Sequence, residues 1–332
     1  MANYDIFDEQ YYLSQYPFVK DAIAKGLVKS GLDHFQKYGQ AAGFANVSRY
    51  FDEANYLENN PDLRPFIRTF NPNGTFVSGL DHFIQYGYDE GGRRTQVSTQ
   101  VSSEYNEDFY LANNSDLLPF IKNVTFKSGY QHFIKYGAKE GRFGTSFFEP
   151  EYLKKNPNLV PFINSGALKT GRYHYFQFGE FETNRSATFV GSHTNDTVTG
   201  VGVGNVEIIG VEVGIDPSGN RQYESFGTNE FDVLIGDSGK DTFVLGVPAT
   251  AGNAAATPLY LGNGQATIRN FAINRDFIQL QGSSLNNYNL VPVGNDLSIQ
   301  TSFGDVLGVI QGGANLSFTV QTINPNGTFL IG

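Results

Sequence analysis

SGLDHFIQYG, at residues 78–87, is one of four copies of a single aromatic phrase in the first half of this chain. The other copies are SGLDHFQKYG at 30–39, SGYQHFIKYG at 128–137 and TGRYHYFQFG at 170–179. The second half contains no copy. A phrase repeated in this way is typical of an array of similar units, and arrays more often form contact surfaces than a single catalytic pocket.

Each unit is predicted to consist of two or three short helices. Leu80, Phe83 and Ile84 have the i, i+3, i+4 spacing of one apolar helical face. Gly87 is expected to end that helix as a glycine cap, and Pro65 is expected in a first helical turn.

An acidic and aromatic phrase opens each unit. It occurs as FDEQYYL from Phe7, FDEANYL from Phe51, YNEDFYL from Tyr105 and FFEPEYL from Phe147. Acid pairs such as Asp52-Glu53 are predicted to cap the first helix of the unit, where negative charge meets the positive end of the helix dipole. Acid–base catalysis by these pairs is the less favoured interpretation.

The sequence changes character near Ala187. Of the 48 Phe and Tyr residues 36 precede this point, whereas 22 of the 38 Gly residues follow it. The second half alternates Val, Ile and Thr with Gly, Asn and Asp turns, which predicts short strands. The later candidate strands are 241–245, 265–268, 277–280, 297–301, 306–310 and 317–321. We therefore predict an α+β multidomain protein with a four-unit α-helical repeat domain at 1–186 and a Gly-rich all-β domain, a β-roll or sandwich, at 187–332.

Composition narrows the classes of function. The net charge of −10 argues against nucleic acid as a partner. There is no cysteine, which excludes disulfides and thiolate metal sites. The N-terminus lacks the pattern of a classical signal peptide, and no stretch predicts a transmembrane helix. Arg93 and Arg94, in a glycine-rich loop, are interpreted as solvated surface.

The strongest chemical candidate is GTNEFDVLIGDSGKDTFVL at 227–245, which contains two nine-residue frames in tandem. Each frame has a Gly first and an Asp sixth, so Asp232 and Asp241 are nine residues apart, and GSHTNDTVT at 191–199 is a looser third frame with Asp196. Asp237 is the next candidate ligand. Gly turns expose carbonyls and Asp supplies anionic oxygens, a combination that favours calcium.

These frames resemble the RTX, or hemolysin-type, nonapeptide β-roll repeat, in which turn carbonyls and the repeat Asp hold calcium. The family pattern has Gly at positions one, two and four, but Thr228 and Glu230 replace two of these in the first frame. Only two frames are consecutive. The alternative is a relic of the repeat that folds as ordinary β-turns without metal.

Two further resemblances concern location. DTFVLG at 241–246 and INRDFIQLQGSSLNNYNL at 273–290 resemble the C-terminal, bluetail-like domain of cyanobacterial surface proteins. The four-copy unit resembles FDxxYYL…SGxxHFxxYG repeats of bacterial secreted proteins. Both resemblances imply an extracellular or cell-surface location, reached without an N-terminal signal peptide by a type I-like route.

His34, His82, His132 and His174 occupy the same place in each unit, and none forms a short metal-ligand pair. We predict that each packs beside its neighbouring aromatic and bonds a carbonyl or an acid. No catalytic motif such as GxSxG or HExxH is present. The rival prediction of an enzyme requires a deep pocket in which carboxylates converge. The candidates for such convergence are Glu149, Glu151, Glu180 and Glu182.

These observations predict a secreted bacterial surface or matrix protein without catalytic residues. It is expected to act by self-association or adhesion, in filaments or layers, with a calcium-stabilised β domain. The alternative is a carbohydrate-binding module that recognises surface polysaccharide through exposed aromatics.

Overall fold

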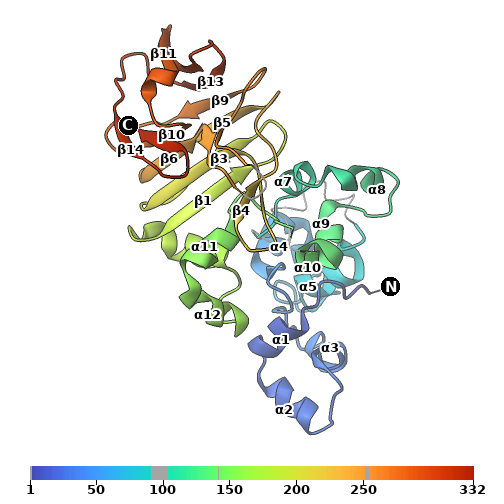
Figure 1. Cartoon of the computed structure of the whole chain (residues 1–332). Coiled ribbons are helices and arrows are strands. Elements are labelled where there is room, and N and C mark those ends of the chain that lie inside the picture. The colour runs from blue at the N-terminus through green and yellow to red at the C-terminus, as the bar shows by residue number, and fades with distance from the viewer. Residues whose placement is uncertain (1, 91–103, 141, 251–253) are drawn as a thin grey trace. The chain divides into compact units, whose positions relative to one another are not determined.

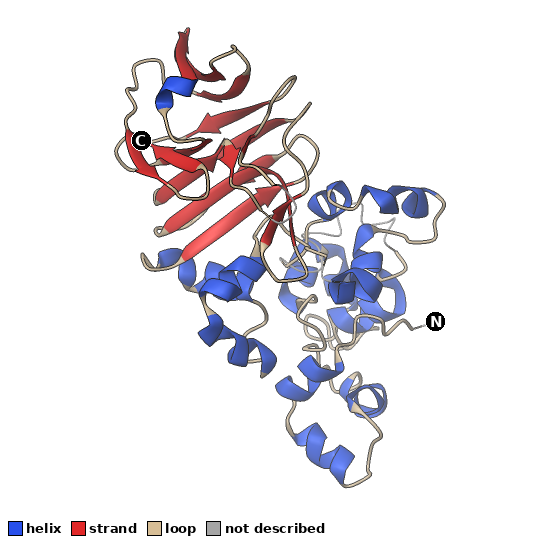
Figure 2. Cartoon of the chain, in the orientation of Figure 1, coloured by secondary structure: helices blue, strands red, loops and turns tan. Residues whose placement is uncertain are grey.

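The computed structural model describes residues 2–90, 104–140, 142–250 and 254–332, and these form an α+β protein. Two compact units are present, one formed by Met1–Thr145 with Asn158–Tyr173 and the other by Ser146–Pro157 with His174–Gly332. The first is helical and the second contains the sheets (Figures 1 and 2). Every helix among the described residues is too short or too polar to cross a bilayer. Arg93 and Arg94 lie outside the described residues.

The helices are all short. The α-helices are α1 (Glu9–Gln15), α2 (Phe18–Ala24), α3 (Gly31–His34), α4 (Glu53–Asn59), α5 (Gly79–His82), α7 (Glu107–Ala112), α8 (Leu118–Lys122), α9 (Gly129–His132), α10 (Ala138–Glu140), α11 (Glu149–Lys155), α12 (Val160–Asn164) and α13 (Gly171–Gln177). The π-helices are η1 (Phe35–Gly39), η3 (Phe83–Gly87) and η5 (Phe133–Gly137). The 3₁₀ helices are η2 (Pro61–Phe66), η4 (Ser115–Leu117), η6 (Pro157–Leu159), η7 (Gly179–Phe181) and η8 (Leu285–Asn287).

We call each stretch from an acidic and aromatic phrase through the following aromatic phrase a segment, so the chain has four segments. Acidic residues cap two helices in each of the first two segments. Asp52 is the N-cap of α4 and accepts a hydrogen bond from the backbone N–H of Asn55, as predicted. Glu53 instead reaches the helix of the aromatic phrase and accepts from the N–H groups of Gly79 and Leu80 at 2.6 and 2.8 Å. These N–H groups begin α5 and have no partner within the helix. The acid pair therefore joins the two ends of the segment, a role that sequence reasoning missed.

The prediction that Gly87 ends its helix as a glycine cap is wrong. The backbone passes from α5 into the π-helix η3 and continues in a right-handed conformation through Tyr88. Glycine is required here for a different reason, because a Cβ atom at position 87 would lie 2.3 Å from the hydroxyl of Tyr56. A Cβ atom at Gly39 or Gly137 would clash in the same way with the hydroxyl of Tyr12 or Tyr110. Each glycine thus makes room for a buried tyrosine.

Prolines behave differently in different segments. Pro65 lies inside the 3₁₀ helix η2, not in a first turn, whereas Pro119 and Pro161 do lie in the first turns of α8 and α12. The i→i+3 hydrogen bonds of a short 3₁₀ helix do not include the i→i−4 bond that a proline removes from an α-helix interior.

One continuous core joins the first three segments. It includes Tyr12, Phe35, Tyr56, Phe83 and Tyr110, all at most 2% exposed. The amide of Gln131 in the third segment donates to the carbonyl oxygen of Tyr88 in the second, and Tyr130 donates to the carbonyl of Tyr50. Neighbouring segments are therefore joined by buried hydrogen bonds as well as by apolar packing.

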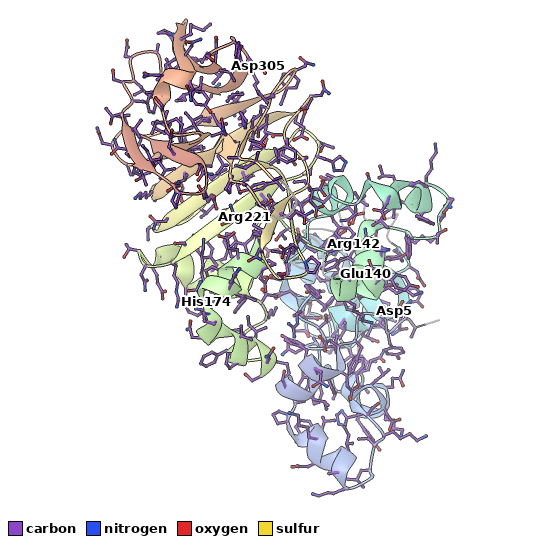
Figure 3. The ribbon with its side chains drawn as sticks, in the orientation of Figure 1. Asp5, Glu140, Arg142, His174, Arg221 and Asp305 are labelled. Carbon is purple, nitrogen blue, oxygen red and sulfur yellow. The ribbon has the colours of Figure 1, made fainter. Side chains whose placement is uncertain are left out.

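A buried asparagine with an arginine closes the third segment. Asn114 donates to the carbonyl of Tyr110 at 2.8 Å and accepts from Arg142 at 2.6 Å. Arg142 also pairs with Asp116 and with Glu140, beside which it is labelled in Figure 3. Arg185 and Asn156 make the corresponding contact at the fourth segment. Asn114 in the turn and Arg142 near the end of the third segment therefore form one contact between residues 28 positions apart.

The second compact unit contains two large sheets. Its strands are β1 (Ser186–Gly191), β2 (Thr197–Thr199), β3 (Asn205–Ile215), β4 (Arg221–Tyr223), β5 (Phe231–Ile235), β6 (Lys240–Val244), β7 (Gly246–Val247), β8 (Thr257–Pro258), β9 (Gln265–Arg269), β10 (Phe277–Gln281), β11 (Tyr288–Val293), β12 (Asp296–Thr301), β13 (Val306–Ile310), β14 (Val320–Ile323) and β15 (Thr328–Ile331). One sheet has the order β1-β3-β6-β10-β15-β14 and the other β11-β12-β13-β9-β5-β2.

Apart from β4, which pairs with β3, and the separate hairpin of β7 and β8, the strands up to β10 enter the two large sheets alternately. The pairs β1/β3, β3/β6 and β6/β10 are parallel in one sheet, and β2/β5, β5/β9 and β9/β13 are parallel in the other. The chain therefore moves back and forth between two parallel sheets until β10, after which antiparallel hairpins complete both. Isoleucine, leucine and phenylalanine fill the core, and Ile208, Leu234, Phe243, Ile268 and Ile278 have no exposed surface.

Five of the six later candidate strands lie within one residue of observed ones. The exception is 317–321, where the strand β14 begins only at Val320. The change from helices to strands falls between η7 and β1. The domain boundary at 186–187 stays a prediction, because neither compact unit is continuous in sequence.

The contact between Tyr56 and Gly87 yields a stability prediction. Gly87→Ala should destabilise the full chain by about 1–3 kcal/mol, because the added methyl meets the tyrosine hydroxyl. Tyr56→Phe should cost about 1 kcal/mol through the lost hydrogen bond with His82. The double variant should be more stable than Gly87→Ala alone, since the atom that clashes is gone. Denaturant unfolding measures all three, and a double variant with fully additive losses would contradict the contact.

Candidate functional site

The four aspartates predicted to bind metal do not form one group. Asp196 and Asp232 lie at the start of neighbouring strands of the sheet that contains β2 and β5. Asp237 lies in the turn before β6, in the other sheet, and Asp241 is the second residue of β6. Within the described part of the chain, no three acidic or histidine side chains have the geometry of a metal site. The nine-residue spacing of Asp232 and Asp241 separates them because consecutive frames enter opposite sheets.

Asp196 and Asp232 serve as turn acceptors. Asp232 accepts from the backbone N–H of Asp196 at 2.8 Å and from the hydroxyl of Tyr260 at 2.7 Å. Asp196 in turn accepts from the N–H and the hydroxyl of Ser192. Gly210 on β3 allows this packing, because a Cβ there would lie 2.5 Å from a carboxylate oxygen of Asp232. The repeat aspartates therefore stabilise one turn against the next.

Glu230 extends this pair into an acidic cluster that sequence reasoning missed. Its side chain is 5% exposed, and its Oε2 atom has no hydrogen-bond partner among the described residues. Burial, followed by the charge of Asp232, raises the pKa of Glu230 to about 8. Burial likewise raises the pKa of Asp232 to about 7 and the pKa values of Asp196 and Glu212 above their usual range. The sequence did contain a signal for this cluster. Glu230 replaces the Gly expected at position four of the first frame, which places a carboxylate in the turn.

The other turn contains a second stack of carboxylates. Asp241 accepts from the N–H of Asp237 at 2.8 Å and donates its own N–H to Asp276 at 3.2 Å. Asp241 is fully buried, its Oδ1 atom lacks a partner among the described residues, and burial raises its pKa to about 7. Arg275 pairs with Asp276 at 2.9 Å and also donates to the carbonyl of Asp237. This turn therefore contains its own cation.

The two turns differ in how well they suit calcium. Two buried carboxylate oxygens without partners, in Glu230 and Asp241, are hard anionic ligands of the kind that calcium prefers. Near Glu230 the principal charged neighbours are other acids and His193, which lies 3.2 Å from Glu212. Near Asp241, Arg275 already supplies positive charge. The residues around Glu230 fit a divalent cation better.

The recurrent histidines are packing residues whose partner was not predicted. In all four segments the Nδ1 atom shares a hydrogen bond of 2.8–2.9 Å with a buried tyrosine hydroxyl, not with a carbonyl or an acid. The pairs are Tyr12–His34, Tyr56–His82, Tyr110–His132 and Tyr152–His174, the last of which is labelled at its histidine in Figure 3. Burial lowers the pKa of His34, His132 and His174, which keeps their rings neutral at pH 7.

Exposed aromatic residues recur at two positions in each segment. One aromatic directly follows the proline that precedes the aromatic phrase (Pro17, Pro65, Pro119 or Pro161). The other directly precedes the final glycine of that phrase. They are Phe18, Tyr38, Phe66, Tyr86, Phe120, Tyr136, Phe162 and Phe178, each 42–57% exposed. Their neighbours Val19, Ile67 and Ile163 are buried. Because the same two positions are exposed in all four segments, their exposure follows from the recurring sequence pattern and not from the conformation of a single loop.

The carboxylates proposed for an enzyme do not converge. Glu151 lines a cavity of about 530 Å³ in the second compact unit, whereas Glu149, Glu180 and Glu182 do not line it. Arg221, labelled in Figure 3, pairs with Glu151 and Glu207 at once. Glu207 is half-buried, which raises its pKa, but the charge of Arg221 outweighs this and holds the pKa below the usual range. The two acids of this cavity are thus neutralised by Arg221 together with Lys155, whose ammonium lies 2.6 Å from Glu151.

No protein-family model matches the chain, and no curated protein matches it significantly. The resemblances to RTX repeats, to the bluetail-like domain and to the secreted helical repeats therefore stay predictions.

The raised pKa values predict a loss of stability as pH rises. In the unfolded chain Glu230, Asp232 and Asp241 ionise near pH 4, whereas in the folded protein they keep their protons until about pH 7–8. The contribution of these three acids to the free energy of unfolding should therefore be largest below pH 4. It should fall between pH 4 and 8, by about 1.4 kcal/mol per pH unit for each group that differs in protonation.

Glu230→Gln should flatten this dependence without calcium, because the amide never ionises. Glu224→Gln, at an exposed acid nearby, is the matched control. Denaturant unfolding at pH 5 and pH 8 in chelator measures the effect. Equal pH dependence in the wild type and Glu230→Gln would contradict the assigned protonation.

Proposed function

We propose that this protein is a non-enzymatic secreted surface or extracellular-matrix protein of bacteria that acts by self-association or adhesion. The observation that supports this proposal best is the recurrence of two exposed aromatic residues in each of four segments. Exposed aromatics on a folded scaffold are enriched at contact surfaces because they bury a large apolar area with few rotatable bonds. An array of weak contacts gains strength through multivalency.

We also propose that the four segments are repeats of one unit and that the parallel part of the sheets is a β-roll. The first statement is supported by the same Tyr–His hydrogen bond in all four segments and by the same Glu cap in the first three. The second is supported by the alternation of strands between two parallel sheets. Variation of loop length between otherwise identical contacts is what duplication of one unit produces.

Self-association in filaments or layers follows from heterologous contacts between such repeats on different molecules. A contact between unlike faces does not close on itself, so it propagates into an open assembly. An extracellular location, reached by a type I-like route, is part of this proposal. Its support is the resemblance of the tail to secreted surface proteins.

Calcium stabilisation of the β part is the chemical component of the proposal. Asp196, Glu230 and Asp232, with Glu212 nearby, are the candidate ligands, and since no three of them have the geometry of a metal site, binding would require their side chains to move together. The ion would supply the positive charge that their turn lacks. Asp237 and Asp241 are the weaker candidate, because Arg275 already neutralises their turn. Binding requires these acids to lose their protons, so the effect of calcium should grow with pH.

The calcium proposal predicts a pH-dependent thermal shift. At pH 8, about 5 mM calcium should raise the melting temperature of the wild type by several degrees, whereas at pH 5 it should not. Glu230→Gln should abolish most of the shift, and Asp241→Asn should retain most of it. Differential scanning fluorimetry against magnesium measures this. An unchanged melting temperature in calcium and in chelator at pH 8 would refute structural calcium.

Self-association is tested with the exposed aromatics. Replacing Phe66, Tyr86, Phe120 and Tyr136 by Ser should shift the full chain from large assemblies towards the monomer, since each lost contact weakens a multivalent array. Phe303→Ser is the control, because this residue is 98% exposed but lies outside the segments. Sedimentation velocity and electron microscopy measure assembly. A wild type that stays monomeric at high concentration would contradict self-association.

A further inference from the structure

We propose that the exposed aromatics and the lysines between them form a binding surface for an acidic polysaccharide, such as a uronate chain. This inference rests on the proposed function, in that the same aromatics are taken as the contact surface. It adds the chemical class of the partner and the residues that select it.

The surface lies on three stretches that we call the display segments, residues 17–39, 65–87 and 119–137. Each begins at the proline before the first exposed aromatic and ends at the glycine after the second. Together they contain eight Lys and Arg residues against three Asp residues, although the whole chain has a net charge of −10. All eight basic residues are exposed, whereas only one of the three acids is. The display segments are thus locally basic on an acidic protein.

Several acids of the helical part are held in internal hydrogen bonds, although others, such as Asp62 and Asp116, are exposed. Glu9, Glu53 and Glu107 each accept two backbone N–H groups at the start of an aromatic-phrase helix. Asp81, within a display segment, is 6% exposed and accepts from Gln40 and Gln85. Lys37 pairs with Asp33 at 2.8 Å, but all the lysines of the display segments are exposed, so their charge faces solvent.

Most acids of the β part are at least partly covered. Residues 187–332 contain twelve Asp and Glu residues, of which four are buried, six are half-buried and only Glu224 and Asp237 are exposed. The negative charge that a second copy could offer the display segments is therefore scattered. A separate polyanion presents a denser and more continuous negative charge to them.

Aromatic rings and cations are neighbours within the display segments. Phe76 bridges its segment, since its N–H bonds the carbonyl of Phe66 at 2.8 Å and its ring lies 5.8 Å from that of Tyr86. Phe126 bridges its segment in the same way. Its N–H bonds the carbonyl of Phe120, and its ring centre lies 6.1 Å from that of Tyr136. The ammonium of Lys135 lies 5.4 Å from the ring centre of Tyr136. A sugar ring stacks its C–H face on such aromatics while its carboxylate meets the ammonium.

The type of cation favours carboxylated sugars over nucleic acid. Seven of the eight basic residues are Lys, which bind as point charges, and only Arg68 offers the bidentate fork suited to phosphate. Widely spaced carboxylates along a sugar chain match the one basic position that recurs in every display segment, Lys20, Arg68 and Lys122.

The test uses the full chain with polygalacturonate, its neutral methyl ester and an oligothymidylate of equal charge, all in chelator. Biolayer interferometry at 50 and 300 mM salt should show polygalacturonate binding that weakens with salt, and methyl-ester binding at least tenfold weaker. Equal binding of the ester, tighter binding of the oligonucleotide, or no binding of polygalacturonate would each overturn the proposal.

Matched variants assign the surface. The triple variant K122Q/K127Q/K135Q should bind polygalacturonate about tenfold more weakly. K139Q/K240Q/R269Q, which removes three cations from outside the display segments, should change binding less than twofold. F120S/Y136S should also weaken binding, with F303S as its control. Equal effects of the two triple variants would show that only net charge matters and would overturn the site.

The outcome is separable from that of the proposed function. Sedimentation without polysaccharide measures self-association of the same variants. Assembly that persists in a protein unable to bind polygalacturonate refutes this inference and leaves the proposed function standing. Polygalacturonate binding by a stable monomer supports this inference and refutes self-association.

Discussion

The hydrogen bond between a buried tyrosine hydroxyl and a histidine Nδ1 atom is the constraint on which the helical segments depend. It joins the first helix of a segment to its last, across 22 or 26 residues. It also requires glycine beside the hydroxyl, since any Cβ there would clash. The histidine ring in turn supports the aromatic four residues later, as in His82–Tyr86 with ring centres 6.0 Å apart. The exposed position of that aromatic is therefore a consequence of the buried pair.

Charge is distributed by the same logic of burial. Several carboxylates occupy helix starts in the helical part and turns in the β part, where they accept hydrogen bonds from backbone N–H groups that have no partner within the helix or strand. The cost of this arrangement is visible in the β part, where crowding and burial raise the pKa of Glu230 and Asp232. Lysine has no backbone group to satisfy at these sites, so it remains at the surface. An acidic chain thereby presents locally basic segments.

Sequence patterns predicted what depends on neighbours along the chain. The α+β class, most strand positions and the Asp52 cap followed from periodicity and capping preference, because these are local effects. The partner of His82 and the second cap made by Glu53 were not predicted, since both join residues 26 positions apart. The four aspartates predicted as metal ligands are divided between two sheets. Spacing in sequence gave their turns correctly but gave no information on which sheet each turn enters.

The amino-acid sequence by itself determined the number of aromatic segments, the point where helices give way to strands, and the identity of the acids in the turns. These features require only local propensity and the recurrence of a pattern. Tertiary structure decided which tyrosines are buried and which aromatics are exposed, because both kinds occur in the same phrase and differ only in what packs on them. It also decided that Gly87 makes room for a hydroxyl instead of ending a helix, since that choice depends on an atom 31 residues away.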